Sequence, residues 1–376
     1  MRLAFVTNNR FPPREGIGRH ILEIATRLQA RGHGVTILAR GAAFAPWAET
    51  VVDGVRVLNF PHYPLRPFHQ ALDGAELSKW LREGAGGADL LHVHMPLLPP
   101  LLTTLPLIVT FHSPMLHDTR AIAEPGLRPA LIKANARLFS RRYEQSYLDR
   151  ATTVLTVSEA VRMQLEASYR TGGRRPIIVP NGVDTNFFSV AFAAKRDRNI
   201  LYVGRLGYRK GLLRLLEAFA RLPGRAGLEL TLVGEGPLEL ALHRRAAALG
   251  ISGQVRFAGF LDRAGVRAAL QTAGCFVNPA DYESGPLTLL EAMACGTPVV
   301  STVTGLAAEM GRRPPLRLSG LEPASLAAAL HDTLADAAAA AARAGEARAL
   351  VVTRFSWDRV VDQLETVYGL RQERAA

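Results

Sequence analysis

Short apolar runs alternate along this chain with longer segments in which apolar positions recur every three or four residues. Such runs are typical of buried parallel strands, and such segments of amphipathic helices. The alternation predicts an α/β protein in which helices flank parallel sheets. In the first half we expect strands at 2–7, 34–39, 51–59, 89–94, 106–111, 152–157 and 176–180, and helices at 17–31, 72–84, 129–148 and 159–168.

The same rhythm restarts after the turn dipeptide Asn181-Gly182. A chain of 376 residues is too long for one ordinary core, so we expect two domains, 1–182 and 183–355, and a C-terminal helix within 356–376 that crosses back to the first domain. The Ala-rich segment 323–349 is predicted to be helical. Further strands are expected at 199–203, 228–233, 254–258, 274–278 and 298–301, and helices at 211–222, 237–249, 262–272, 286–295 and 356–371.

Composition narrows the class of protein. An apolar content of 48% is that of a folded globular chain. The two cysteines, Cys275 and Cys295, form no disulfide framework, and we expect small buried residues in a reducing compartment. There is no apolar run long enough to span a membrane and no apolar leader-like segment at the start. We therefore expect a cytoplasmic protein.

Charge is unevenly distributed. Net charge is +12, and residues 1–182 hold 22 Lys and Arg against 14 Asp and Glu. An anionic partner such as a phospholipid surface, a lipid pyrophosphate or nucleic acid fits this excess, and an arginine-rich proteome fits it equally well. Lys133, Arg137 and Arg141 recur at helical spacing, which suits a helix resting on an anionic membrane. An ordinary solvated face is the simpler interpretation.

The most informative segment is YESGPLTLLEAMACGTP at 282–298. Pro286 suits the first turn of a helix, and Gly296 and Pro298 mark the end of that helix. Glu283 is therefore expected in the loop before the helix and Glu291 within it. Both carboxylates are predicted to face one crevice, where they accept hydrogen bonds from sugar and ribose hydroxyls.

The start of this predicted helix is suited to an anion. The amides of Ser284, Gly285 and Leu287 lie at the positive end of the helix dipole, a natural place for a phosphate. A pair of hydrolytic carboxylates is the alternative. It is disfavoured because eight helical residues rise about 12 Å, whereas glycosidase carboxyls lie roughly 5 to 9.5 Å apart.

Polar residues also follow the predicted strands of the first half. Gly16 and Gly18 lie in the first strand–helix loop, but the third glycine of a dinucleotide fingerprint is missing, which argues against a nicotinamide cofactor. His92 and His94 share one face of a strand, and His112 stands where the next strand ends. Because no third ligand with suitable spacing is evident, a zinc site is not predicted.

In the second half, Gly204-Arg205 follows a strand and Lys210-Gly211 begins a helix. A rigid arginine and a flexible lysine beside a helix start would form a pyrophosphate clamp, although two solvated surface cations explain the same residues. Gly234 and Gly236 end the next strand, where a flat base could lie against the backbone. There is no Walker loop, so nucleotide hydrolysis is not indicated.

Together these segments resemble the family 4 ("group 1") glycosyltransferases, retaining enzymes of the GT-B fold. That fold has two Rossmann-like domains facing a deep inter-domain cleft. The matching segments occur in the family's order and span most of the chain. They are GIGRHILEIATRLQARGHGVTIL, VTFHSP, VLTVSEAV, VPNGVDTNFF, LYVGRLGYRKGLLRLLEAF, LVGEGP, VRFAGF, the two-glutamate segment and FSWDRV.

The resemblance implies a role for each matching residue. The implied catalytic residues are His112, Glu283, Arg205 and Lys210. The implied donor-binding residues are Gly16, Gly204, Arg205, Lys210, Gly234, Glu235, Gly236, Phe260, Glu283, Ser284, Gly285, Pro286, Leu287 and Glu291. The implied acceptor-binding residues are Arg14, Glu15, Gly16, His92 and His112. No metal and no cofactor are implied, since the nucleoside-diphosphate sugar is a co-substrate.

Three positions depart from the family's pattern. The first loop reads Glu15-Gly16 where two glycines are common, and Ser284-Gly285-Pro286 replaces the usual Gly-Phe-Gly or Ser-Phe-Gly. Gly305-Leu306 replaces a Gly-Gly pair. The first departure bears on how the acceptor is bound and the second on which donor is used.

The resemblance implies transfer of a hexosyl residue, most naturally from a UDP- or GDP-sugar, with retention of configuration. The acceptor would be a glycan, a lipid-linked glycan or a small molecule, and a lipid-linked acceptor goes with peripheral contact at the inner face of an anionic membrane. A sugar-nucleotide epimerase or a phosphorylase on the same scaffold is an alternative. A nucleic-acid-binding module is another, but the chain has no dense basic cluster interleaved with aromatics, so no nucleic acid is expected.

Overall fold

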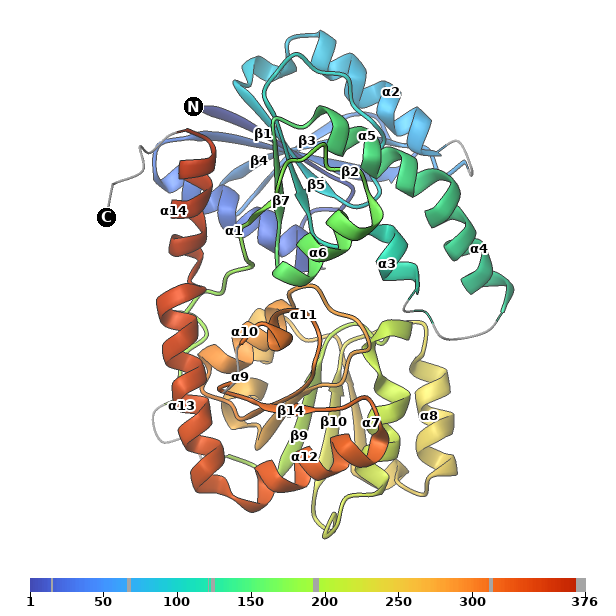
Figure 1. The fold of residues 1–376 in the computed structure, drawn as a ribbon, viewed down its shortest axis with the longest axis vertical. Coiled ribbons are helices and arrows are strands. Elements are labelled where there is room, and N and C mark those ends of the chain that lie inside the picture. The colour runs from blue at the N-terminus through green and yellow to red at the C-terminus, as the bar shows by residue number, and fades with distance from the viewer. Residues whose placement is uncertain are drawn as a thin grey trace. The chain divides into compact units, whose positions relative to one another are not determined.

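The computed structural model describes residues 1–14, 16–65, 69–120, 122, 126–191, 196–310 and 314–369. The chain divides into two compact units, each built on its own sheet (Figure 1). Unit 1 contains the chain up to Asn181 and the C-terminal residues from Trp357, and unit 2 is built on Gly182–Ser356. The chain passes from unit 1 to unit 2 after Asn181 and returns at Trp357. These two connections lie side by side, because the amide of Val183 donates to the carbonyl of Phe355 at 2.8 Å.

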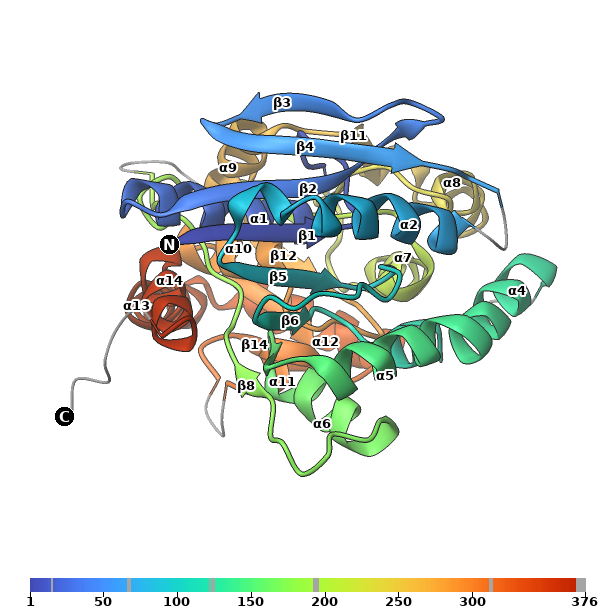
Figure 2. The ribbon, with the colours of Figure 1, turned by 90° about the horizontal axis from the view of Figure 1, so that it is seen from above.

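The sheet of unit 1 has the strand order β3-β4-β2-β1-β5-β6-β7-β8. Its strands are β1 (Arg2–Thr7), β2 (Gly34–Ala43), β3 (Ala48–Val52), β4 (Val55–His62), β5 (Leu90–Met95), β6 (Leu107–Phe111), β7 (Thr153–Thr156) and β8 (Ile177–Ile178). All neighbours are parallel except β3 and β4, which form a hairpin at the sheet edge (Figure 2). The prediction of one strand at 51–59 was therefore wrong. Asp53 and Gly54 both have positive φ, so the chain turns there.

The helices of unit 1 cover the faces of this sheet. They are α1 (Gly16–Ala30), α2 (His69–Arg82), α3 (Met115–Arg120), α4 (Leu127–Asn135), α5 (Arg141–Arg150), α6 (Glu159–Ser168) and α14 (Trp357–Val367). The helix predicted at 129–148 is present as α4 and α5, which a π-helical turn at Ala136–Ser140 joins. Helix α3 was not predicted, since its six residues are too few to show a period.

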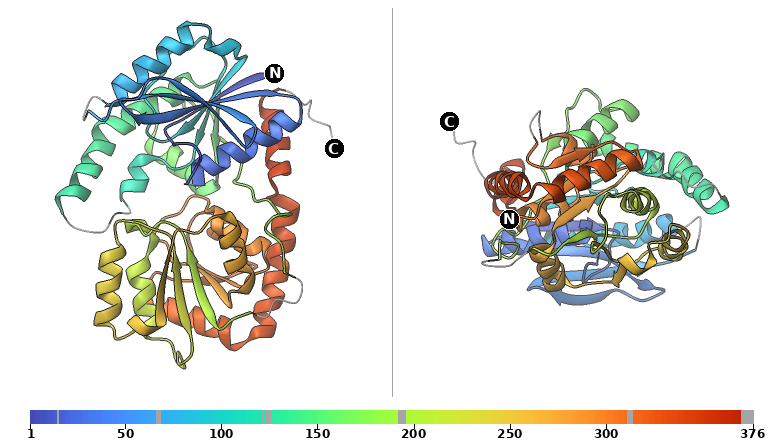
Figure 3. Two further views of the ribbon diagram at one scale, coloured as in Figure 1. Left: turned by 180° about the vertical axis from the view of Figure 1, so that it is seen from behind. Right: turned by 90° about the horizontal axis from the view of Figure 1, so that it is seen from below.

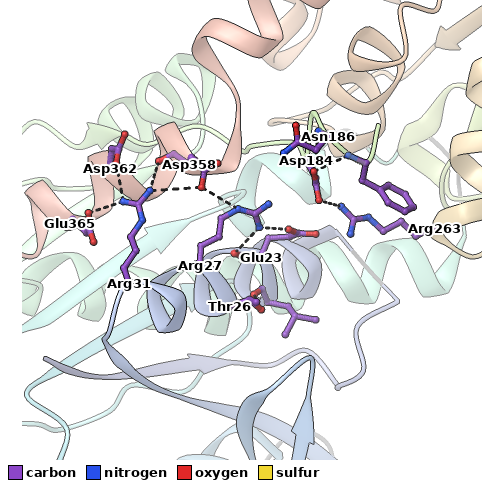
Figure 4. A network of polar contacts seen from close by, with 12 residues as sticks. Glu23, Thr26, Arg27, Arg31, Asp184, Asn186, Arg263, Asp358, Asp362 and Glu365 are labelled. Atoms are coloured by element: carbon purple, nitrogen blue, oxygen red, sulfur yellow. Dashed lines mark hydrogen bonds and ion pairs between the residues drawn. The ribbon is translucent and has the colours of Figure 1, made fainter. Parts of the chain in front are cut away.

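The last helix, α14, packs beside α1 in unit 1 (Figure 1). Arg31, the residue that follows α1, donates to Asp362 and Glu365, at 2.8 Å in each case, as Figure 4 shows. Glu365 is almost fully buried, so removing Arg31 would take the arginine charge away from a buried carboxylate and destabilise the fold. Arg27 lies 3.7 Å from Asp358 on the same helix pair.

Unit 2 has a six-stranded parallel sheet in the order β11-β10-β9-β12-β13-β14. Its strands are β9 (Asn199–Val203), β10 (Glu229–Val233), β11 (Val255–Gly259), β12 (Cys275–Asn278), β13 (Val299–Thr302) and β14 (Arg317–Ser319). Its helices are α7 (Leu212–Ala220), α8 (Glu239–Ala248), α9 (Arg263–Thr272), α10 (Leu287–Ala294), α11 (Gly305–Ala308), α12 (Pro323–Ala335) and α13 (Ala337–Arg354). Helices α7 and α8 lie side by side (Figure 3, yellow-green and yellow).

The Ala-rich segment of unit 2 contains two helices where one was expected. Asp336 separates α12 from α13, and its carboxylate accepts from the amide of Ala339 at 2.9 Å. Aspartate is a good N-cap because it satisfies an amide that the helix cannot, so the chain restarts there. Cys275 and Cys295 are free and buried, as predicted, and burial raises the pKa of each thiol to about 12. No helix in the described part of the chain is long and apolar enough to cross a membrane.

Strand order indicates where a ligand site is expected on each sheet. In unit 2, β9 lies between β10 and β12, so the chain changes direction across the sheet between β9 and β12. In unit 1 the same reversal occurs between β1 and β5. Loops at such reversals diverge at the carboxyl ends of the strands and leave a crevice where ligands of open α/β sheets bind. The residues that follow these strands are therefore the first candidates for a site.

Glu144 on α5 fastens the connection from β6 to α3. Its carboxylate is fully buried and accepts from the amide of Met115, at 2.9 Å, and from the hydroxyl of Tyr169. Met115 begins α3 only three residues after His112. Burial raises the pKa of Glu144 from 4.5 to about 7, because the hydrogen bonds only partly offset the loss of water.

This raised pKa predicts a stability that falls with pH. Between about pH 4.5 and 7 the unfolded chain loses the Glu144 proton before the folded chain does, so the free energy of unfolding decreases as pH rises. Glu144→Gln should remove this dependence, whose full size is on the order of 3 kcal/mol. Urea unfolding followed by tryptophan fluorescence reports on unit 1, which contains Trp47, Trp80 and Trp357.

The exposed Glu166→Gln on α6 is the matched control and should leave the dependence unchanged. The assignment is wrong if the difference in unfolding free energy between Glu144→Gln and the native protein is the same at pH 5 and pH 8.

Candidate active site

In unit 2 the loops after β9 and β10 are packed against each other through their backbones. The hydroxyl of Tyr202 donates to the carbonyl of Arg205, and the amide of Leu206 donates to the carbonyl of Glu235, both at 2.9 Å. Gly234 has φ of 124°, and a Cβ there would lie 2.0 Å from the carbonyl oxygen of Gly204. Only glycine allows this approach. Arg205 is consequently held by its main chain while its side chain is exposed.

The segments after β9 and β12 meet through an ion pair. The ammonium of Lys210, just before α7, contacts the carboxylate of Glu283, just before α10. Their side chains are 22% and 13% exposed, so the pair is largely shielded but reachable from solvent. Two residues that the sequence placed in separate roles are therefore direct partners at the β9–β12 reversal.

Two further cations, which sequence reasoning missed, contact the loop that carries Glu283. Arg214 on α7 donates to the carbonyl of Pro279, at 3.1 Å, and forms an ion pair with Asp281. The guanidinium of Arg209 lies 5.9 Å from the ring centre of Tyr282. Burial lowers the pKa of Arg209, and the charge of Glu283 partly offsets that.

Backbone contact also fixes Glu283. Gly305, the first residue of α11, has φ of 48°, and a Cβ there would lie 2.3 Å from the carbonyl oxygen of Glu283. Leu306 beside it is buried in the apolar core of unit 2. The departure from a Gly-Gly pair thus keeps glycine where the backbones touch and places leucine where the core needs volume.

The other residues of unit 2 that are predicted to bind the donor lie on the same sheet edge or on α10. Helix α10 begins at Leu287, one residue later than predicted, because Pro286 is its N-cap with ψ of 123°. Glu291 is half-buried within that helix, so the two glutamates occupy loop and helix as expected. Glu235 is exposed beside Gly236, and Phe260 is exposed directly after β11.

In unit 1 the β1–α1 connection brings Arg14 and Gly16 to the carboxyl edge of the sheet, both exposed. Glu15 lies outside the described residues. At the reversal between β1 and β5, Thr7 pairs with His94, and His112 follows the adjacent β6. Arg14, Gly16, His94 and His112 therefore share one edge.

The histidines of unit 1 form a buried cluster. Nδ1 of His94 lies 3.2 Å from Nε2 of His112. His20, on α1, packs edge-on against His112 with ring centres 4.7 Å apart, and Trp357 of α14 packs on His20 at 5.4 Å. Sequence reasoning missed His20, although the four-residue spacing from Gly16 puts it on the first turns of the helix that begins at this edge.

His92 lies deeper than predicted. It is fully buried, with Nδ1 at 2.7 Å from the hydroxyl of Tyr368 and Nε2 at 2.7 Å from the hydroxyl of Thr110. Both ring nitrogens are thus engaged inside unit 1. Adjacent β6 and the residue that follows α14 supply these partners, and an acceptor contact of His92 stays a prediction.

Burial keeps these imidazoles neutral. It lowers the pKa of His20 to about 4 and that of His92 to about 3, and it lowers the pKa values of His94 and His112 well below 6.5. The charge that one protonated ring would impose on the next adds to this effect. At neutral pH His112 can therefore donate or accept a hydrogen bond, but it is a poor cation.

The cluster changes the argument about metals. Among the described residues, His20, His94 and His112 each offer a ring nitrogen within 4.8 Å of the others. Nδ1 of His20 and Nε2 of His94 are buried and have no hydrogen-bond partner among the residues that the structure describes. A zinc site was not predicted because no third ligand was evident in the sequence. In the structure, His20 of α1 supplies a third ring nitrogen.

Comparison with known proteins agrees with this architecture. The family described as "Glycosyl transferases group 1" matches residues 184–314, and "Glycosyltransferase Family 4" matches residues 14–187. The phosphatidyl-myo-inositol mannosyltransferase of Mycolicibacterium smegmatis is 30% identical over 390 residues, covering 98% of this chain and 93% of the relative. The glycogen synthase of Mycobacterium tuberculosis is 29% identical over 383 residues, covering 94% and 90%.

Solved structures show the same fold at lower identity. The sucrose-phosphate synthase of Thermosynechococcus elongatus superposes with a TM-score of 0.81 at 20% identity, covering 98% of each chain. WaaG, a glycosyltransferase involved in lipopolysaccharide biosynthesis, superposes with a TM-score of 0.75 at 22% identity, covering 98% of this chain and all of WaaG. The chain has the two-domain GT-B fold and belongs to the family 4, or group 1, glycosyltransferases.

Proposed function

We propose that this protein transfers a hexosyl residue from a nucleoside-diphosphate sugar, UDP- or GDP-linked, to a hydroxyl group and retains the anomeric configuration. The Lys210–Glu283 ion pair carries the proposal. It sets one cation and one carboxylate beside the first turn of α10, at a strand-order reversal. A diphosphate requires the cation and the helix amides, and sugar hydroxyls require the carboxylate.

In this proposal unit 2 binds the donor. Arg205, Lys210 and the amides from Ser284 to Leu287 contact the diphosphate, Glu283 binds the sugar, and Glu291 accepts from the ribose hydroxyls. The backbone at Gly204, Gly234 and Gly236 is proposed to lie against the nucleoside. Lys210 exchanges its contact with Glu283 for the phosphate when donor arrives, which frees the carboxylate to accept from the sugar.

Charge develops on the diphosphate as the bond to the sugar breaks. Cations and helix amides that are already oriented stabilise that charge without further reorganisation. The leaving phosphate takes the proton of the acceptor hydroxyl on the same face of the sugar, so no protein base is required. Neutral His112 is proposed to position the sugar through a hydrogen bond, since its lowered pKa makes it unsuited to act as a cation.

Unit 1 is proposed to bind the acceptor through Arg14, Gly16 and His112. A glycan or lipid-linked acceptor is supported by the names of two relatives, a glycogen synthase and a phosphatidyl-myo-inositol mannosyltransferase. For a lipid-linked acceptor we propose peripheral contact with the inner face of an anionic membrane. No nucleic acid is part of the proposal.

The clamp is tested by measuring the binding of nucleoside diphosphates. Lys210→Ala should weaken binding of the preferred diphosphate about tenfold or more, because a charged hydrogen bond contributes about 1.5–3 kcal/mol. Thermal-shift titration with UDP, GDP, ADP and dTDP identifies the base and measures the loss. Exposed Arg221→Ala is the control, and unchanged affinity in Lys210→Ala would refute the clamp.

Turnover and diphosphate affinity should distinguish the roles of Glu283 and Glu291. Glu283→Gln should lower turnover about a hundredfold or more while changing diphosphate affinity little, because its contact is to the sugar. Glu291→Gln should instead weaken diphosphate binding through the ribose. Equal effects of both variants on binding and turnover would contradict these roles. A proton NMR time course of the product, with anomeric coupling as the readout, should show retained configuration.

The reaction is proposed to need no metal. Turnover should be unchanged by an excess of EDTA, because the cations that stabilise the diphosphate are side chains. The buried His20, His94 and His112 cluster makes this a demanding test. Loss of activity in EDTA that a divalent cation restores, together with metal found in the purified protein, would overturn the proposal.

A further inference from the structure

The helix from Leu127 to Arg150 exposes an apolar stripe in unit 1. Leu127 is 77% exposed, Leu131 60%, Leu138 57% and Phe139 40%. These four residues lie within thirteen positions. Single exposed apolar side chains are common on protein surfaces, but a contiguous group of this kind marks an interaction site.

Helical spacing puts the stripe opposite the buried side of the helix. Pro129, Ala136, Ser140 and Glu144 face the interior of unit 1, at intervals of seven, four and four residues. Leu127 and Leu131 are four residues apart, and Leu138 follows seven later, so the leucines line the other side. In Figure 2, α4 extends away from the sheet of unit 1.

The same stretch is strongly basic. Residues 127–142 contain five Lys and Arg and no Asp or Glu. Arg137, Arg141 and Arg142 are exposed beside the leucines. Arg141 also donates to the carbonyl of Ser168 on unit 1, at 3.3 Å, which anchors its guanidinium near the helix. We call the leucines, Phe139 and these three arginines the basic leucine face.

Charge and apolarity together select one partner. A second copy would bring the same positive charge against it, and nucleic acid would leave the leucines without a role. An anionic bilayer satisfies both, because leucines enter the acyl boundary while arginines meet lipid phosphates.

We propose that the basic leucine face docks unit 1 on the anionic surface of a lipid bilayer. The proposed transferase function supplies the purpose, since unit 1 also carries the residues proposed to bind the acceptor, but the binding itself requires neither donor nor acceptor. The face gives the enzyme access to acceptors confined to a membrane.

Sedimentation with sucrose-loaded vesicles tests the proposal on the full chain. We expect binding to vesicles of phosphatidylcholine with 30% phosphatidylglycerol and little binding to phosphatidylcholine alone. Leu131→Gln with Leu138→Gln should weaken binding about tenfold or more, because two apolar side chains no longer insert. Arg137→Gln with Arg142→Gln should weaken vesicle binding by a similar factor, because each lost charge costs about fivefold in affinity. Added salt should also weaken binding, because it screens the attraction between arginines and lipid phosphates.

Matched controls come from equally exposed residues elsewhere. Leu102→Gln removes a leucine that is 76% exposed and lies outside the helix from Leu127 to Arg150, and Arg244→Gln removes an exposed arginine of unit 2. Both should bind vesicles as the native protein does. Because glutamine is a good helix former, the test variants should keep their diphosphate-induced thermal shift.

The proposal is overturned if the leucine variants bind anionic vesicles normally, or if their only change is a loss of self-association in sedimentation velocity. It is also overturned if the protein binds an oligonucleotide but not the vesicles, and if that binding is lost in the arginine variants. Failure to bind vesicles would not argue against the transferase function. Absence of turnover would not argue against binding to vesicles.

Discussion

The parallel pairing of strands is the constraint on which both halves of this protein depend. Parallel strands place all their carboxyl ends on one edge, and each reversal of strand order opens a crevice there. In unit 2 the reversal lies between β9 and β12, and in unit 1 between β1 and β5. Apart from His92, which lies within β5, the described residues implicated in donor or acceptor binding follow one of the strands at that edge or lie on the helix that the loop begins. Topology therefore locates the candidate site before any side chain is considered.

In unit 2 the site is held by close backbone contact as well as by charge. Gly234 and Gly305 let loops approach to distances that a Cβ would forbid, and the second of these contacts fixes the carbonyl of Glu283. Arg214 holds the carbonyl of Pro279 four residues earlier. Glu283 is consequently fixed on both sides, and its carboxylate meets Lys210 without any donor. Such preorganisation allows a site to stabilise developing charge with little rearrangement.

In unit 1 the C-terminal helix contributes to the interior around the histidines. Trp357, at its start, packs on His20, and Tyr368, just after its end, is hydrogen-bonded to His92. Arg31 joins this helix to the end of α1, the helix that carries His20. A segment more than 200 residues away from β5 thus closes over the buried imidazoles and keeps them neutral. Trp357 of the FSWDRV segment therefore packs against His20, a histidine that the first half of the chain carries.

Hydrophobic period and turn chemistry determined most elements from the sequence, since strands β1, β5, β6 and β9 and helices α1 and α6 need only local information. Local information also located Glu283 in a loop and Glu291 in a helix. It failed at Asp53-Gly54 and at Asp336, where one turn or cap outweighed the pattern around it. Pairings between distant residues were decided only by tertiary structure: His20 with His112, Lys210 with Glu283, and Tyr368 with His92. The physical reason is that burial, which sets these partners and the histidine pKa values, depends on which elements pack together and not on the neighbours in the chain.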